Sequence, residues 1–130
     1  MSEHTHLTVS TDHAVKGIDA TLVENRHLRV VLLQGKGGDI LEFRDKRTDI
    51  DVLWSTPHNW QPPSNSFVHI DSNTSWDTHY PGGWQQNLPV AGGARGEVSG
   101  VQYDQHGESA LIPWEVTTVS ESTTAVTSDL

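Results

Sequence analysis

The sequence predicts an all-β protein. Short runs rich in β-branched and aliphatic residues recur along the chain, and Gly, Pro, Asn and Asp separate them. Apolar and polar residues alternate in two neighbouring runs, with Ile40 and Phe43 in the first and Ile50 and Val52 in the second. The early runs show no helical periodicity, so strands and turns account for the pattern.

The first half of the chain is expected to hold a series of short strands. Residues 1–19 form a polar lead-in, and residues 20–130 form the domain itself. Asn25 and Arg26 supply a two-residue turn, the glycine-rich residues 34–38 form a loop, and residues 45–48 close a β-hairpin. The strands are expected at residues 7–10, 20–24, 27–33, 39–44 and 49–54.

The second half is dominated by a long loop, residues 55–89, which is unusual inside a compact domain. Four aromatic residues in it are expected to hold it against the body, and long ordered loops often build binding sites. Residues 91–100 are expected to turn, with strands at 101–103, 110–120 and 123–127. The four aromatic anchors are Trp60, Phe67, Trp76 and Trp84.

Composition narrows the class of protein. The chain has 130 residues, of which 34% are hydrophobic, and it contains five Trp. This composition predicts a globular protein that can bury a core. It has no Cys, which excludes disulfides, thiolate metal sites and a Cys nucleophile. Residues 1–12 lack the apolar centre of a signal peptide, and the longest apolar run is residues 30–33. A cytoplasmic location without membrane attachment is expected.

The net charge is −9, from 17 acidic and 8 basic residues. Nucleic acid binding requires clustered Lys and Arg, and no such cluster is present, so nucleic acid is not expected as a partner. The skew toward acidic residues fits two descriptions equally. One is an ordinary acidic protein, and the other is a protein adapted to a high-salt cytoplasm.

A histidine between carboxylates stands at residues 104–108. If this segment is an extended strand, Asp104, His106 and Glu108 share one face. The carboxylates would then favour the protonated imidazole, which makes His106 a candidate general acid, and the same trio has the chemistry of a divalent-metal site. The alternative is a polar turn that ends at Gly107.

A second candidate site lies at residues 80–89. Glycines allow the backbone to approach a ligand, Trp84 offers a flat apolar ring, and Gln85, Gln86 and Asn87 offer hydrogen-bond donors and acceptors. Sugars need this combination, because their C–H faces stack on aromatic rings and their hydroxyls form hydrogen bonds. The alternative is a turn whose Trp covers the core.

Other chemistries are weakly supported. Eight His suggest metal, but their spacings, such as His4-x-His6 and Asp77-x-His79, form only scattered pieces of a site, so no metal or other cofactor is expected. The loop at residues 35–38 lacks the Gly-Lys-Ser/Thr ending and the following helix of a phosphate loop. No Ser lies in a Gly-x-Ser-x-Gly turn.

Three blocks in order resemble the aldose 1-epimerase (galactose mutarotase-like) family. They are VENRHLRVVLLQGKGGDILEFRDKRTDIDVLW (residues 23–54), YPGGWQQNLPVAGG (residues 80–93) and HGESALIPWEV (residues 106–116). The resemblance implies a large antiparallel β-sandwich that holds an aldose in a cleft. It also implies acid–base interconversion of anomers, in which a Glu takes the proton of the anomeric hydroxyl and a His protonates the ring oxygen.

His106 matches the His of the family's His-Gly motif, so the resemblance implies that it contacts substrate or handles the proton. Trp84 and Gln85 match the neighbouring segment and would line the cleft. With the polar residues named above, the candidate set is His106 for catalysis and Trp84, Gln85, Asn87 and Glu108 for binding the aldose.

The family's catalytic Glu lies later in its chains, and nothing here matches it, so an enzyme is expected only in a complete form. An incomplete sandwich would expose a strand edge and invite self-association or a complementing chain. The alternatives are a non-catalytic carbohydrate-binding β-sandwich fragment and a metal-binding β-protein.

Overall fold

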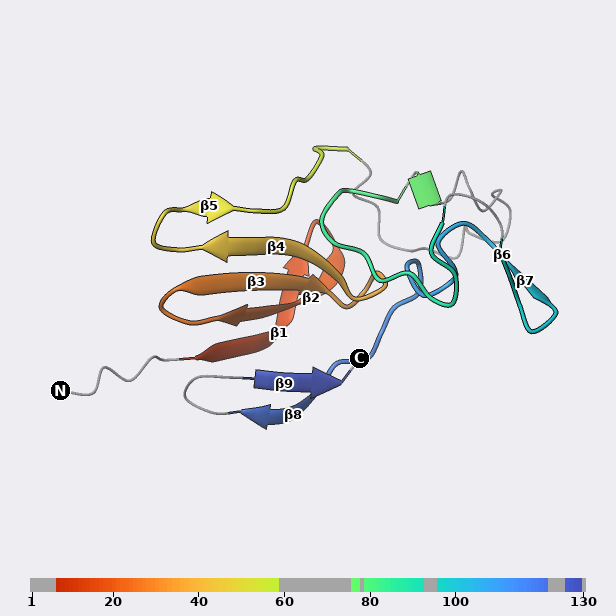
Figure 1. Cartoon of the computed structure of the whole chain (residues 1–130). Helices are drawn as coiled ribbons and strands as arrows, with labels where there is room; N and C mark the ends of the chain where they lie inside the picture. Colours follow the sequence, from red (N-terminus) through yellow and green to blue (C-terminus); the bar gives the residue numbers. More distant parts are fainter. Residues whose placement is uncertain (1–6, 59–75, 78, 93–95, 122–125, 130) are drawn as a thin grey trace.

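The computed structural model describes residues 7–58, 76–77, 79–92, 96–121 and 126–129. Its main body is a five-stranded sheet in the order β1-β2-β3-β4-β5, in which each strand pairs antiparallel with the next (Figure 1). The predicted all-β antiparallel class is confirmed, and the arrangement is consistent with an incomplete β-sandwich. The strands of this sheet are β1 (Thr8–Val15), β2 (Ile18–Glu24), β3 (Leu28–Leu33), β4 (Asp39–Asp45) and β5 (Ile50–Asp51).

Two further hairpins lie outside this sheet (Figure 1). One consists of β6 (Gly96–Val98) and β7 (Val101–Tyr103), and the other of β8 (Thr117–Glu121) and β9 (Val126–Asp129). Strand β7 lies where the sequence predicts it. Strand β6 lies inside the predicted turn region, and β8 starts only at Thr117, so the β-rich residues 114–116 are not part of a strand.

The turn between β2 and β3 forms as its residues predict. The Asn25 side-chain oxygen accepts hydrogen bonds from the backbone N–H groups of His27 and Leu28, both at 2.8 Å. The Asn25 N–H donates to the Leu28 carbonyl at 2.9 Å. Such an Asx turn pairs backbone N–H groups that the hydrogen bonds between β2 and β3 leave free. It thereby stabilises the chain reversal between the two strands.

The polar lead-in predicted for residues 1–19 contains more strand than the short one expected at residues 7–10. The strand β1 extends to Val15 and pairs with β2 along most of its length. Lys16 and Gly17 connect the two strands with φ values of 50° and 84°, the left-handed pair that a tight hairpin turn requires. Lys-Gly is a weaker turn signal than Asn-Gly, and the polar residues of β1 conceal its alternation.

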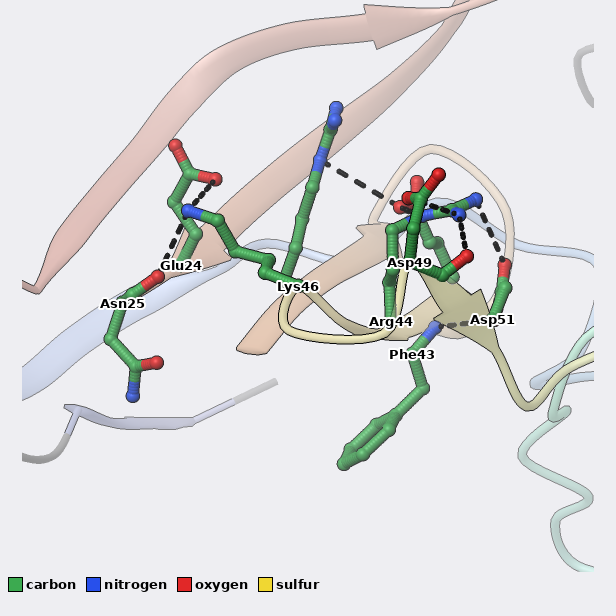
Figure 2. A network of polar contacts seen from close by, with 9 residues as sticks. Glu24, Asn25, Phe43, Arg44, Lys46, Asp49 and Asp51 are labelled. Carbon is green, nitrogen blue, oxygen red and sulfur yellow. Dashed lines mark hydrogen bonds and ion pairs between the residues drawn. The ribbon is translucent and has the colours of Figure 1, made fainter. Parts of the chain in front are cut away.

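The buried core lies on one face of the sheet, where β2, β3 and β4 meet. It consists of Ile18, Ala20, Val31, Leu33 and Leu41. By register, the charged residues Glu24, Arg29, Arg44 and Asp51 continue this face toward the far ends of the strands. Figure 2 shows their network, in which Arg44 contacts Glu42 at 2.6 Å and Asp49 at 3.0 Å.

No helix in the described part of the chain is long and apolar enough to cross a membrane.

Candidate functional site

The loop that carries Trp84 is hydrogen-bonded into the sheet edge. Trp84 forms an antiparallel bridge with Ile40 of β4, through two backbone hydrogen bonds of 2.8 Å. Gly82 forms a second bridge, with Ser55. A Cβ at Gly83 would lie 2.5 Å from the Ile40 carbonyl oxygen, so only glycine allows this approach. The loop thereby places Trp84 beside β4, with 58% of the residue exposed.

The two candidate segments of the sequence lie side by side. Leu88 forms a parallel bridge with Gly107, and the Leu88 N–H donates to the Ser109 hydroxyl at 2.9 Å. The Ser109 hydroxyl in turn donates to the Gln86 carbonyl at 3.3 Å. Residues 85–88 and 106–109 are therefore neighbours, although about twenty residues of chain separate them. This pairing brings together four of the predicted residues, which are Gln85, Asn87, His106 and Glu108.

The extended strand considered for residues 104–108 does not form. The strand β7 ends at Tyr103, and the Gly107 N–H donates to the Asp104 carbonyl at 3.0 Å, which closes a turn. His106 and Gly107 have φ values of 61° and 74°, so side chains do not alternate here as in a strand. The common face proposed for Asp104, His106 and Glu108 is therefore wrong, and the turn alternative describes this segment. His106 is half-buried and Glu108 is exposed.

Trp76 joins the two segments through its ring. Its indole stacks on Tyr80, with centroids 4.7 Å apart, and meets the His106 imidazole at 4.2 Å with the planes tilted by 41°. Its N–H donates to the Gln85 side-chain oxygen at 2.8 Å. The sequence identifies Trp76 only as an aromatic anchor of the long loop. Its contact with His106 depends on tertiary structure that no spacing reveals.

A buried ion pair extends this network into the protein. The Gln85 side-chain nitrogen donates to Asp39 Oδ2 at 3.4 Å, and the Lys36 ammonium donates to the same oxygen. Both members of the pair are fully buried. Burial raises the pKa of Asp39, while Lys36, Gln85 and the Gln86 backbone oppose the rise. Sequence analysis missed this pair, because Lys36 belongs to a glycine-rich loop where a charged residue is normally exposed.

Three buried polar atoms of this region have no hydrogen-bond partner among the described residues. They are Asp39 Oδ1, Asn87 Oδ1 and His106 Nδ1. Buried polar atoms in native proteins are nearly always paired, with protein, water or ligand. Asn87 and His106 belong to the two adjoining segments, so each segment carries one polar group that can accept or donate a further hydrogen bond.

Among the residues described, no group of three or more His, Asp or Glu has the arrangement of a metal site. His4 and His6 lie outside these residues. The carboxylates and imidazole of residues 104–108 do not converge, because the turn separates them.

No family model, no curated protein and no solved structure matches this chain. The resemblance to the aldose 1-epimerase family therefore rests on the three sequence blocks alone.

Proposed function

We propose that this chain binds an aldose at the surface formed by residues 84–88 and 106–109, as an aldose 1-epimerase-like protein. One observation carries the proposal. The Leu88–Gly107 bridge joins the two sequence blocks that resemble the family's substrate segment, and it gathers polar side chains from both. The resemblance and the local geometry thus point to the same place.

Trp84 would stack on the sugar. Its ring is exposed, and its N–H has no partner among the described residues. Two other tryptophans are used internally, since Trp76 donates to Gln85 and Trp114 donates to the Ser109 carbonyl at 3.1 Å. An exposed indole with a free N–H offers both an apolar face and a hydrogen-bond donor, which suits the two sides of a sugar ring.

The polar contacts would come from Asn87, His106 and Glu108. The unpaired Asn87 Oδ1 and His106 Nδ1 are buried, so the accessible atoms of these two half-buried side chains would meet the sugar. The exposed Glu108 can accept hydrogen bonds from hydroxyls. Gln85 has a different part in this proposal. Its amide already bonds to Trp76 at one end and Asp39 at the other, so it mainly positions the Trp76 ring against His106.

In the complete reaction, a carboxylate base takes the proton of the anomeric hydroxyl while the His106 imidazolium protonates the ring oxygen. The C1–O5 bond breaks, the open aldehyde rotates about C1–C2, and the reverse transfers close the ring as the other anomer. No residue of this chain matches the family's base. We therefore expect the 130-residue chain to bind aldoses and to accelerate mutarotation little on its own.

Tryptophan fluorescence titrated with D-galactose and D-glucose tests the binding. The expected result is a saturable change that Trp84→Ala abolishes. Trp54→Ala is the matched control, because Trp54 is 69% exposed and its indole N–H equally lacks a partner among the described residues, but it lies outside the proposed site. The same response in the Trp84 and Trp54 variants, or no response in the wild type, would contradict the proposal.

Chemical rescue separates catalysis from binding alone. With acetate as an external base, the chain should accelerate mutarotation of α-D-galactose in polarimetry beyond the rate in acetate alone, and His106→Ala should remove this gain. Saturable binding without rescue would instead favour the second candidate, a non-catalytic carbohydrate-binding fragment. The exposed Trp84 serves that function equally well.

A further inference from the structure

The backbone at His106 is fixed on both sides of the residue. The His106 N–H donates to the Gly92 carbonyl at 3.1 Å, and the N–H of the next residue, Gly107, donates to the Asp104 carbonyl at 3.0 Å. His106 and Gly107 both adopt a left-handed conformation, with φ values of 61° and 74°. These contacts determine where the His106 side chain leaves the backbone. The direction of the imidazole then depends on what packs against the ring.

The two ring nitrogens of His106 differ in exposure. Nδ1 is buried and has no hydrogen-bond partner among the described residues. Nε2 forms no hydrogen bond with these residues either, but it is not buried, and His106 as a whole is half-buried. The nitrogen that can meet a ligand is therefore Nε2.

The face of the imidazole lies against the Trp76 indole. A histidine that transfers protons is usually oriented by a hydrogen bond at the nitrogen that faces away from the substrate, and Nδ1 of His106 makes no such bond with the described residues. The ring contact with Trp76 has centroids 4.2 Å apart and planes tilted by 41°. Aromatic rings at this separation attract each other, so the indole opposes rotation of the imidazole.

Trp76 is held in place by two further contacts. Its indole stacks on Tyr80, with centroids 4.7 Å apart and planes 18° apart, and its N–H donates to the Gln85 side-chain oxygen at 2.8 Å. The Gln85 amide donates in turn to Asp39, the fully buried first residue of β4. Trp76 is thereby anchored to the main sheet, and His106 packs against an indole that is fixed by this anchorage.

We propose that Trp76 is a positioning residue for His106, and this role rests on the proposed function, in which His106 protonates the ring oxygen of the aldose. Trp76 holds the imidazole with Nδ1 inward and Nε2 toward the bound sugar. Proton transfer requires a donor within hydrogen-bond distance and correctly directed. An imidazole that turned freely would seldom meet this requirement, so Trp76 acts on the reaction through His106.

Trp76→Leu and Trp76→Phe form a matched pair that tests this role. Both substitutions remove the N–H that donates to Gln85, and both leave a smaller side chain. Phenylalanine alone keeps a flat aromatic face against His106, so the ring face is the difference between the two variants. Urea unfolding followed by circular dichroism verifies that each variant is folded. Trp76→Met takes the place of the leucine variant if that one unfolds.

Alkylation with iodoacetamide measures the orientation of the imidazole without any sugar. The chain has no Cys to compete for the reagent, so histidines can react near neutral pH. The His106 peptide is isolated after digestion, and its Nε2 and Nδ1 products are separated and quantified. The wild type and Trp76→Phe should react mainly at Nε2, because Nδ1 is buried. In Trp76→Leu the Nε2/Nδ1 ratio should fall about 3- to 10-fold, the factor that an aromatic pair is worth.

Acetate-assisted mutarotation of α-D-galactose measures the consequence for the reaction. Trp76→Leu should lower the maximal rate about 10-fold or more, because a misdirected donor is a poor catalyst, whereas Trp76→Phe should keep most of it. The half-saturating galactose concentration should change little, since Trp84 is intact.

A leucine variant that keeps the Nε2 selectivity or the rate of the wild type would overturn the positioning role. Wild-type alkylation mainly at Nδ1 would overturn it too. If the wild type accelerates no mutarotation but Trp76→Leu still loses the selectivity, the proposed function fails alone. Trp76 then stands as the residue that orients His106.

Discussion

At the scale of single residues, the buried ion pair of Lys36 and Asp39 lies beneath the candidate site and is connected to it through Gln85. A fully buried ammonium and carboxylate lose their hydration, and their attraction offsets this loss only when the geometry and further hydrogen bonds are good. Here Gln85 adds one hydrogen bond to Asp39 Oδ2, while Oδ1 has none. The pair therefore contributes little net stability, yet each charge depends strongly on the other.

Removing one charge should destabilise the protein far more than removing both. We expect Lys36→Met to lower the free energy of unfolding at neutral pH by about 3–5 kcal/mol, because the Asp39 carboxylate would remain buried without its counterion. The double variant Lys36→Met/Asp39→Asn should recover most of this loss. Urea unfolding of the wild type, the single variant and the double variant measures both values, and equal losses in the two variants would contradict the argument.

The same variants have a distinct pH dependence. Because the folded-state pKa of Asp39 is raised above 3.8, the folded protein binds this proton more tightly than the unfolded chain. The corresponding contribution to stability is complete below about pH 3.8 and is lost as pH rises through the folded-state pKa. The double variant lacks the carboxylate, so its stability should decline less over this pH range than that of the wild type.

At the scale of elements, the pairing of residues 85–88 with 106–109 depends on the absence of a side chain at Gly107. A Cβ there would lie 2.0 Å from the Leu88 carbonyl oxygen, so Gly107→Ala must separate the two segments. We expect a loss of more than about 2 kcal/mol in the free energy of unfolding, since a backbone clash adds to the strain of the positive φ. Sugar-induced fluorescence change should be lost with it.

Gly100→Ala controls for the strain alone. Gly100 has a φ of 80°, close to that of Gly107, but a Cβ there would meet nothing within 4 Å. This variant should lose about 1 kcal/mol and keep the fluorescence response. Equal effects of the two substitutions would show that the contact with Leu88 has no role in holding the segments together.

The sequence predicts some of the residues in these two segments and misses others. Trp84, Asn87 and His106 stand out from composition and resemblance, and the structure brings their segments together. Of the two alternatives for residues 104–108, the turn is the one that forms, and the sequence leaves this open because a left-handed turn at residues 106–107 leaves no trace in an alternation pattern. Trp76 and Lys36 act through contacts across the fold, which local spacing does not encode.

Among the strands, those with strong alternation were the predictable ones. The hairpins of β2–β3 and β4–β5 follow from their aliphatic runs and Asn or Asp turns. β1 was predicted too short because Thr, Ser, Asp and His fill the half-exposed strand, and a register shift between Ser10 and His13 interrupts its periodicity. β6 has only three residues, too few for a pattern to be visible.

At the scale of the whole molecule, the excess of acidic residues should make stability depend on salt. The 17 acidic residues outnumber the 8 basic ones by nine, so many carboxylates have no basic residue of their own to pair with. Among the described residues, five basic side chains already pair with carboxylates: Arg29, Lys36, Arg44, Lys46 and Arg47. Salt screens the repulsion among the acidic residues, and it also screens the exposed pairs, which are worth little individually. Because the acidic residues are in excess, screening of their repulsion should outweigh screening of the ion pairs, so salt should stabilise the folded protein.

We therefore expect the free energy of unfolding to rise, on the order of 1 kcal/mol, between about 0.05 M and about 2 M KCl at neutral pH. Repeating the urea titrations near pH 5.1, the isoelectric point, supplies the control. There the net charge approaches zero, so the gain should shrink. A gain of equal size at both pH values would assign it to salt effects on apolar surface instead of to the acidic charge.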